Sequence, residues 1–254
     1  MNTIDVNGAD DPTAPTSPLD GIEIRTLHSA DQMAELAEVF SQVWGSATPL
    51  VTIEILMAVT HSGGYVCAAY DTGTGEERML GASVAFLAVH LDRPALHSHI
   101  TGLLPGARRS GLGRAMKLHQ RAWAAEQNID WITWTFDPLV RRNAWFNLGV
   151  LGAEVHEYLP SFYGTMTDSI NAGDDSDRLL VAWAVAGPDA LTAPDTTGCT
   201  LVPTPDDVVA LRRINAAAVG RWRSETRTAL YGALKRGDHI IGFTTDGEYV
   251  VKPA

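Results

Sequence analysis

The chain has 254 residues, of which 45% are hydrophobic and 19% charged, so it can bury a proper globular core. Its formal charge of −11 makes nucleic acid or an anionic membrane an unfavourable partner. The absence of a long apolar run or an N-terminal export signal favours a cytoplasmic protein without spanning helices. In that compartment Cys67 and Cys199 are expected as free thiols, although counting alone leaves one disulfide open.

The first half of the chain alternates between predicted helices and strands. Residues 1–20 are rich in Asp and Pro and predict a disordered tail. Apolar spacing then predicts, in chain order, a strand at 21–26, helices at 31–44 and 52–62, a hairpin of strands at 65–70 and 79–89, a strand at 97–104, a helix at 112–127 and a strand at 130–136.

The second half continues this order and then changes character. A short helix at 141–150 precedes strands at 152–158 and 177–185, and the Pro- and Gly-rich residues 188–204 predict a linker. Two helices, 205–219 and 221–236, and a hairpin at 239–244 and 249–252 complete the chain. We therefore expect an α/β domain at 21–187, with a mixed, strongly twisted sheet flanked by helices, and a small α+β extension at 205–254.

A loop rich in Gly and Arg joins the strand at 97–104 to the helix at 112–127. The first amides of a helix have no acceptor within it and lie at its positive end, which suits a phosphate or pyrophosphate. Glycine allows a close approach to the backbone, and arginine adds cationic donors. The alternative is a turn that only shapes the chain. The candidate anion-binding residues are Arg108, Arg109, Ser110, Gly111, Leu112, Gly113 and Arg114.

The spacing of this loop fits neither a Walker loop nor a Rossmann fingerprint. Arg108-x-x-Gly111-x-Gly113 resembles the Arg/Gln-x-x-Gly-x-Gly/Ala signature of the GNAT (GCN5-related N-acetyltransferase) superfamily. The segment 143–153, where a helix ends in Leu-Gly, resembles a second block of that family, and the order of elements over 21–187 is similar. Further motifs resemble a poorly characterised bacterial subgroup: Trp134-Thr-Phe-Asp-Pro138, Arg142-Asn-Ala144, Tyr158-Leu-Pro160, Phe162-Tyr-Gly164 and Ser176-Asp-Arg178.

The resemblance implies the GNAT acyl-CoA N-acyltransferase fold, with acetyl-CoA or another short acyl-CoA as co-substrate. Carried over by position, the backbone of Leu103 and Leu104 would meet the pantetheine, and the loop residues the pyrophosphate. Asn143 would bind near the pantetheine, and Phe146 would pack on that arm. The implied reaction moves an acyl group, acetyl being the first candidate, from coenzyme A to a primary amine of a small molecule.

Acyl transfer needs a base for the amine, and an acid can assist the departing thiolate. His97 and His99 share a strand face and could serve as base, with Asp137 as a rival. The family's usual acid is a tyrosine, but Leu148 stands at that place, so Tyr163 is the candidate replacement, with Tyr158 behind it. For each of these residues a purely structural role is the alternative.

Other functions stay open at this point. The missing tyrosine suits a non-catalytic acyl-CoA-binding or sensor protein, and an N-succinyltransferase acting on amino acids is a further alternative. Arg141, Arg142 and Arg178 could hold a carboxylate or could form surface ion pairs. Arg223 and Arg227 share a helix face that could close over an anionic substrate or dock on the main domain. No metal site is expected, and a homodimer is an alternative to a monomer.

Overall fold

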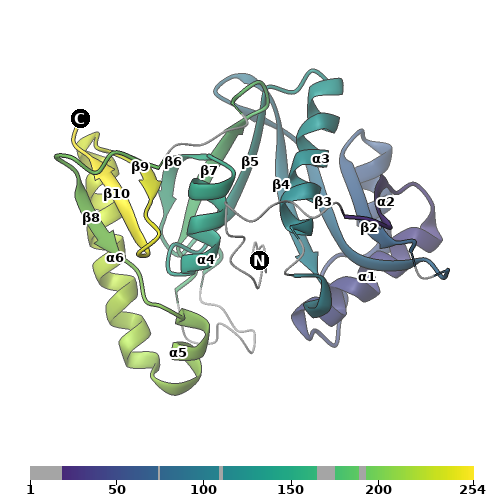
Figure 1. Cartoon of the computed structure of the whole chain (residues 1–254), viewed down its shortest axis with the longest axis horizontal. Coiled ribbons are helices and arrows are strands. Elements are labelled where there is room, and N and C mark those ends of the chain that lie inside the picture. The colour runs from purple at the N-terminus through teal and green to yellow at the C-terminus, as the bar shows by residue number, and fades with distance from the viewer. Residues whose placement is uncertain (1–18, 74, 109–110, 165–174, 189–192) are drawn as a thin grey trace. The chain divides into compact units, whose positions relative to one another are not determined.

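The computed structural model of the chain describes residues 19–254 apart from 74, 109–110, 165–174 and 189–192 (Figure 1). The predicted disordered tail lies, up to residue 18, outside the described residues. The chain divides into two compact units, one of Met1–Thr133 with Ala184–Ala186 and one of Trp134–Trp183 with Gly187–Ala254. The predicted limits of the main domain and of the extension stay predictions.

The first unit is built around an antiparallel run of strands. Strands β1 to β4 pair antiparallel in sequential order, and β5 joins β4 in parallel. The elements are β1 (Ile22–Thr26), α1 (Ala30–Trp44), α2 (Ile53–His61), β2 (Tyr65–Asp71), β3 (Arg78–His90), β4 (Arg93–Leu103), a 3-10 turn (Pro105–Ala107), α3 (Leu112–Glu126) and the first part of β5 (Trp131–Phe136). The helices, strands and hairpin predicted for this part of the chain are confirmed.

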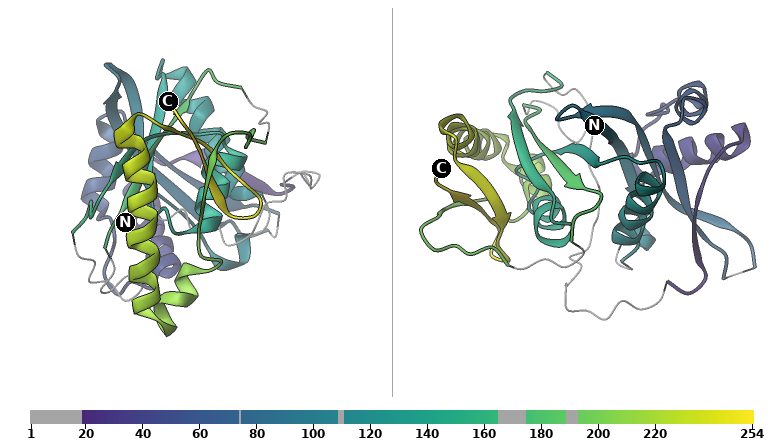
Figure 2. Two further views of the ribbon diagram at one scale, coloured as in Figure 1. Left: turned by 90° about the vertical axis from the view of Figure 1, so that its left-hand side faces the viewer. Right: turned by 90° about the horizontal axis from the view of Figure 1, so that it is seen from above.

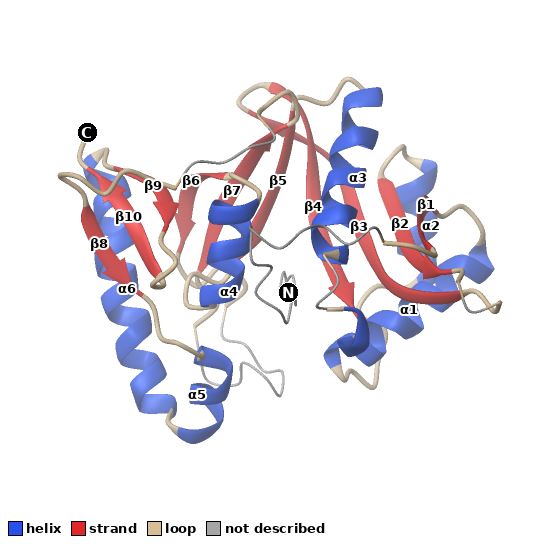
Figure 3. Cartoon of the chain, in the orientation of Figure 1, coloured by secondary structure: helices blue, strands red, loops and turns tan. Residues whose placement is uncertain are grey.

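Helices α1 and α2 share a hydrophobic core with β2, β3 and β4 (Figure 3). Helix α1 begins at a capping box, in which Ser29 and Gln32 each satisfy the other's backbone amide. It ends at Gly45, whose φ of 62° is the left-handed conformation that glycine tolerates. Leu36 and Phe40 on its inner face are fully buried. This layer fixes the position of β4, which carries the candidate residues His97 and His99.

Strand β4 contains a bulge at His99. Val84 of β3 pairs with Ile100, whereas the next residue, Ala85, pairs with Ser98, so His99 is an extra residue on β4. A bulge increases the local twist and redirects side chains, and such irregularities are often found beside functional sites.

The second unit combines the far edge of the larger sheet with a smaller one. Its elements are the rest of β5, α4 (Arg141–Ala144), a π-helical turn (Trp145–Val150), β6 (Glu154–Leu159), β7 (Arg178–Ala184), β8 (Thr200–Pro203), α5 (Val208–Ile214), α6 (Ala216–Arg236), β9 (His239–Phe243) and β10 (Glu248–Lys252). The larger sheet has the order β1-β2-β3-β4-β5-β7-β6, and the smaller one β8-β10-β9. Helix α6 packs on β6, β8 and β9 (Figure 2). A mixed sheet flanked by helices is therefore confirmed.

Two local predictions were wrong, and the predicted helix at 141–150 was right in extent but not uniform in geometry. The predicted linker contains β8, which pairs with β10 and buries Val202. The break between the last two helices falls at Asn215, whose side chain accepts from the Ala218 amide, and not near Gly220, which lies inside α6. The predicted helix at 141–150 changes at Trp145 from α to π geometry.

Both cysteines are free, Cys67 being buried and Cys199 partly exposed. None of the helices that the structure describes is long and apolar enough to cross a bilayer.

Candidate functional site

The start of α3 presents backbone amides without a side-chain cap. Gly111 precedes the helix with a φ of 73°, and no side chain among the described residues caps the first turn. The first helical hydrogen bond runs from the Ala115 amide to the Gly111 carbonyl at 3.0 Å. The amides of residues 112–114 therefore have no acceptor within the helix and suit an anion. The predicted contacts Arg109 and Ser110 lie outside the described residues.

Position 111 requires glycine because of its backbone conformation, not because a side chain would clash with its neighbours. A Cβ there would meet no described atom within 4 Å, but the positive φ strains any other residue. The open surroundings leave room for a ligand close to the amides of Leu112 and Gly113.

Arg108 reaches back to the end of β4. Its Nε donates to the Leu103 carbonyl at 3.0 Å, and the Leu104 amide donates to the Leu80 carbonyl of β3 at 2.8 Å. The Leu103 carbonyl and the Leu104 amide, both predicted to meet pantetheine, thus already have partners within the protein. The first of these bonds ties the guanidinium of Arg108 to the turn between β4 and α3, while Arg114 is half-buried in the first turn of α3.

The ladder between β4 and β5 is short. It pairs only Ala95–His97 with Trp131–Thr133. Within the part of the chain that the structure describes, Ser98 and residues 100–103 of β4 pair on one side, with β3, and residues 98–103 have no strand partner on the other. Backbone groups on such an edge need another acceptor or donor, which an extended amide-bearing ligand can provide.

His97 and His99 both lie against the ring of Phe86, with ring centroids 5.2 and 5.5 Å apart respectively. The Nδ1 atom of His97 lies 3.0 Å from the Thr133 hydroxyl. Burial lowers the pKa of His97 to about 4 and also lowers the pKa of His99. Both imidazoles are therefore neutral at physiological pH, the form in which a histidine can accept a proton.

A buried lysine on α3 was missed by sequence reasoning. Lys117 is 1% exposed, and its Nζ donates to Ser98 Oγ at 3.1 Å and to Gln120 Oε1 at 2.9 Å. Burial lowers its pKa from 10.5 to about 7. The signal was present in the sequence, since Lys117 continues the inward stripe of Gly113, Gln120 and Ala124.

In the second unit, the residues that the resemblance assigns to coenzyme contacts are buried. Asn143 is 1% exposed, and both polar atoms of its side-chain amide lack a hydrogen-bond partner among the described residues. An unpaired buried amide is costly, so it points to a ligand that completes it. Phe146 and Leu148 lie in the adjoining π-helical turn, with exposures of 4% and 8%. Leu148 itself has no proton to give at the place of the family's usual acid.

Asp137 is engaged by two arginines. Its oxygens accept from Arg223 at 2.6 and 3.0 Å and from Arg212 at 2.6 Å. Burial alone would raise the pKa of Asp137, but the two guanidinium groups outweigh it and hold the pKa well below its usual range. A carboxylate in this state is a very weak base, so the structure gives Asp137 a structural role and removes its support as the catalytic base.

Tyr163 lies in a turn whose backbone is hydrogen-bonded by Ser176 and Asp177, two residues of the subgroup motifs. Its amide donates to Ser176 Oγ at 2.7 Å, and the Ser161 amide donates to Asp177 Oδ1 at 2.9 Å. Its ring is 38% exposed, as an acid acting on a bound ligand requires. Tyr158, by contrast, donates to Asp177 Oδ2 at 2.6 Å. Its burial is the main cause of a raised pKa of the Tyr158 hydroxyl, and the Asp177 carboxylate is the second. Tyr158 is therefore a poor acid.

The cationic face predicted on α6 docks on its own unit. Arg223 binds Asp137, and the Nε of Arg227 donates to Asp177 Oδ2 at 2.8 Å. Of the two roles left open by the sequence, docking is the one that the structure supports.

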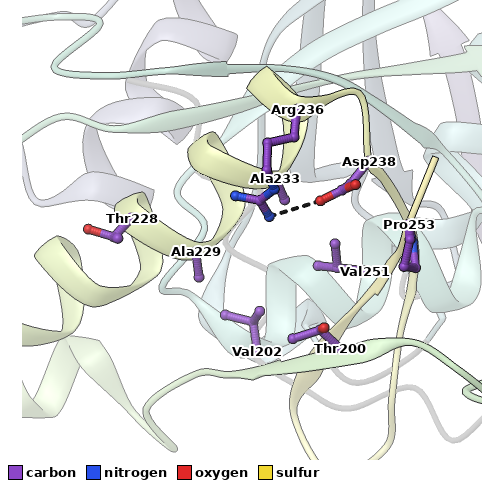
Figure 4. A pocket seen from close by; sticks show the side chains of 9 residues that line it. All are labelled: Thr200, Val202, Thr228, Ala229, Ala233, Arg236, Asp238, Val251 and Pro253. Atoms are coloured by element: carbon purple, nitrogen blue, oxygen red, sulfur yellow. Dashed lines mark hydrogen bonds and ion pairs between the residues drawn. The ribbon is translucent and has the colours of Figure 1, made fainter.

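A pocket in the C-terminal elements has no net charge to offer a ligand. It lies between α6 and the smaller sheet, where Arg236 and Asp238 neutralise each other at 2.8 Å (Figure 4). It is lined by Thr200, Val202, Thr228, Ala229, Ala233, Arg236, Asp238, Val251 and Pro253.

Known proteins match this chain in fold. No family model and no curated protein sequence matches it. The structure of the NatC complex bound to Gag peptide and CoA contains a chain with 13% identity and a TM-score of 0.50, the match covering 64% of this chain and 98% of that one. A ribosomal-protein-S5-alanine acetyltransferase from Vibrio fischeri matches with 16% identity and a TM-score of 0.50, over 65% of this chain and 94% of its own.

These two acetyltransferase structures are similar to this chain in fold. The mixed sheet flanked by helices is the GNAT acyltransferase fold, as the signature loop predicted.

Proposed function

We propose that the protein is an acyl-CoA-dependent N-acyltransferase that moves an acyl group, acetyl first, to a primary amine of a small molecule. The observation that carries this proposal is the uncapped start of α3 behind Gly111, in a fold shared with acetyltransferases. The amides of Leu112, Gly113 and Arg114 bind the pyrophosphate, and Arg108 adds charge. The orphan amide of Asn143 supports the contact to pantetheine that the resemblance assigns to it.

In the reaction, the amine nitrogen attacks the thioester carbonyl, the carbon–sulfur bond breaks, and the amine loses a proton. His97 or His99 is the proposed proton acceptor, directly or through water, because both are neutral at pH 7. Their weak basicity limits them to an amine already made acidic by attack on the carbonyl. Tyr163 is the proposed donor to the thiolate, and water can replace it.

A second candidate is an acyl-CoA-binding protein without turnover, which Leu148 favours because it cannot act as the acid in the family's usual place. Release of free thiol from acetyl-CoA in the presence of a panel of primary amines separates the two. Thiol release that needs both acetyl-CoA and an amine supports the enzyme. Tight coenzyme binding without thiol release on any amine supports the sensor.

A further inference from the structure

Arg178, the first residue of β7, is a buried cation that forms no hydrogen bond or ion pair with a carboxylate among the described residues. It is 4% exposed, and its Nη1 donates to the Asp177 backbone carbonyl at 2.8 Å. Its Nε is buried and has no hydrogen-bond partner within the same described part of the chain.

The carboxylates near Arg178 are already used by other arginines. The Asp137 carboxylate binds Arg223 and Arg212. Both carboxylate oxygens of Asp177 accept hydrogen bonds from Arg227. Arg178 thus has no hydrogen-bonded carboxylate of its own, although the charge of Asp137 acts on it and opposes the lowering of its pKa by burial. A guanidinium cannot discharge by losing its proton at neutral pH, and a buried charge without a counter-ion is costly.

Arg178 lies against a tyrosine that is partly exposed to solvent. Its guanidinium carbon lies 5.3 Å from the centroid of the Tyr163 ring, which offsets part of the cost through a cation–π contact. Tyr163 is 38% exposed, so the residue that covers one side of the cation is itself in contact with solvent. The turn carrying Tyr163 is fastened by Ser176 and Asp177, the two residues directly before Arg178.

We propose that Arg178 binds a carboxylate carried by one of the two reactants, so that the enzyme selects an anionic substrate. The proposal rests on the proposed function. A carboxylate matches the planar, two-pronged guanidinium and supplies the missing negative charge. Two sources carry this chemistry: an amino-acid acceptor, and a dicarboxylic acyl group such as succinyl on coenzyme A.

The test compares matched substrates on the wild type, Arg178→Met and the control Arg221→Met, which removes an exposed arginine of the same unit. One arm pairs amino acids with their amides under acetyl-CoA, and the other pairs succinyl-CoA with acetyl-CoA on a neutral amine. We expect Arg178→Met to lower kcat/KM about 10- to 100-fold on the carboxylate member of one arm and to leave its neutral partner unchanged. The arm that responds identifies the source. An equal loss on both members of each pair would overturn the proposal.

A second readout does not need turnover. Glutamate and succinate, each without coenzyme, should raise the Tm of the wild type and of Arg221→Met but not that of Arg178→Met. Without ligand, Arg178→Met should melt no lower than the wild type, because it removes an unpaired buried charge. A lower Tm, or an equal ligand shift in all three proteins, would mean that Arg178 is structural. If no amine is acylated but the ligand shift depends on Arg178, the proposed function fails while the carboxylate site stands.

Discussion

The two units treat buried positive charge in opposite ways. In the first unit, Lys117 is fully enclosed, and burial brings its pKa to about 7, so the amine sheds its charge near neutral pH. In the second, Arg212 and Arg223 bind Asp137 and Arg178 is buried in the same unit, and guanidinium groups keep their charge at neutral pH.

This difference separates two ways of binding an anion. The first unit offers it the uncharged amides at the start of α3, which can accept a large diphosphate without a buried ion. The second unit keeps a fixed guanidinium charge, which favours a small, planar carboxylate. Substitutions at the buried charged groups of each unit test this difference.

The largest effect is expected at Asp137, the carboxylate that neutralises the charges of Arg212 and Arg223. Asp137→Asn removes the negative charge between Arg223 and Arg212 and should lower the free energy of unfolding by about 3 to 5 kcal/mol, because it leaves buried cations uncompensated. Chemical denaturation measures this. Asp206→Asn is the matched control, because Asp206 is 93% exposed in its pair with Arg141, and should cost at most about 1 kcal/mol. Equal losses in the two variants would contradict the account.

Because Lys117 can lose its charge near neutral pH, we expect the stability of the protein to depend on pH. The folded pKa of Lys117, about 7, lies below its ordinary value of 10.5. The unfolded chain therefore binds more protons between these values, and stability rises with pH. Relative to Lys117→Met, the wild type should gain about 2 to 3 kcal/mol between pH 7 and 9. Burial raises the pKa of Cys67, which has the opposite effect on stability, so the wild type is compared with a variant that retains Cys67. A flat difference would mean that Lys117 stays charged.

A smaller effect is expected for His97 at acid pH. Its folded pKa of about 4 lies below the ordinary 6.5, so the unfolded state takes up its proton first, and stability is lost as the pH falls from 6.5 towards 4. The difference in unfolding free energy between the wild type and His97→Gln should change by about 2 kcal/mol from pH 7.5 to 5. Titration of the imidazole followed by NMR checks the same point, and a midpoint near 6.5 would refute it.

The sequence was most informative where local chemistry decides structure. The cap at Ser29 and the left-handed glycine at Gly45 delimit α1, and the Gly-Arg loop correctly predicted the GNAT fold. The sequence was least informative where partners are distant in the chain. The short strand at 200–203 forms only by pairing with β10.

The candidate site divides in the same way. The helix start at Gly111 could be placed from spacing alone, since its amides are set by local backbone geometry. The pairing of the Asp137 carboxylate with two arginines could not be predicted, because Arg212 and Arg223 lie 75 and 86 residues further along the chain. The loss of charge at Lys117 also depends on enclosure by residues of other elements, which no local pattern reports.

The central claim is that the amides behind Gly111 hold the diphosphate of an acyl-CoA. Isothermal titration of acetyl-CoA into the wild type, Gly111→Val and Gly45→Val tests it most directly. Both glycines have a positive φ and open space around the missing Cβ, so the two variants carry the same backbone strain. We predict that Gly111→Val loses about 100-fold or more in affinity while Gly45→Val binds like the wild type. Normal binding by Gly111→Val, with its fold intact, would contradict the account.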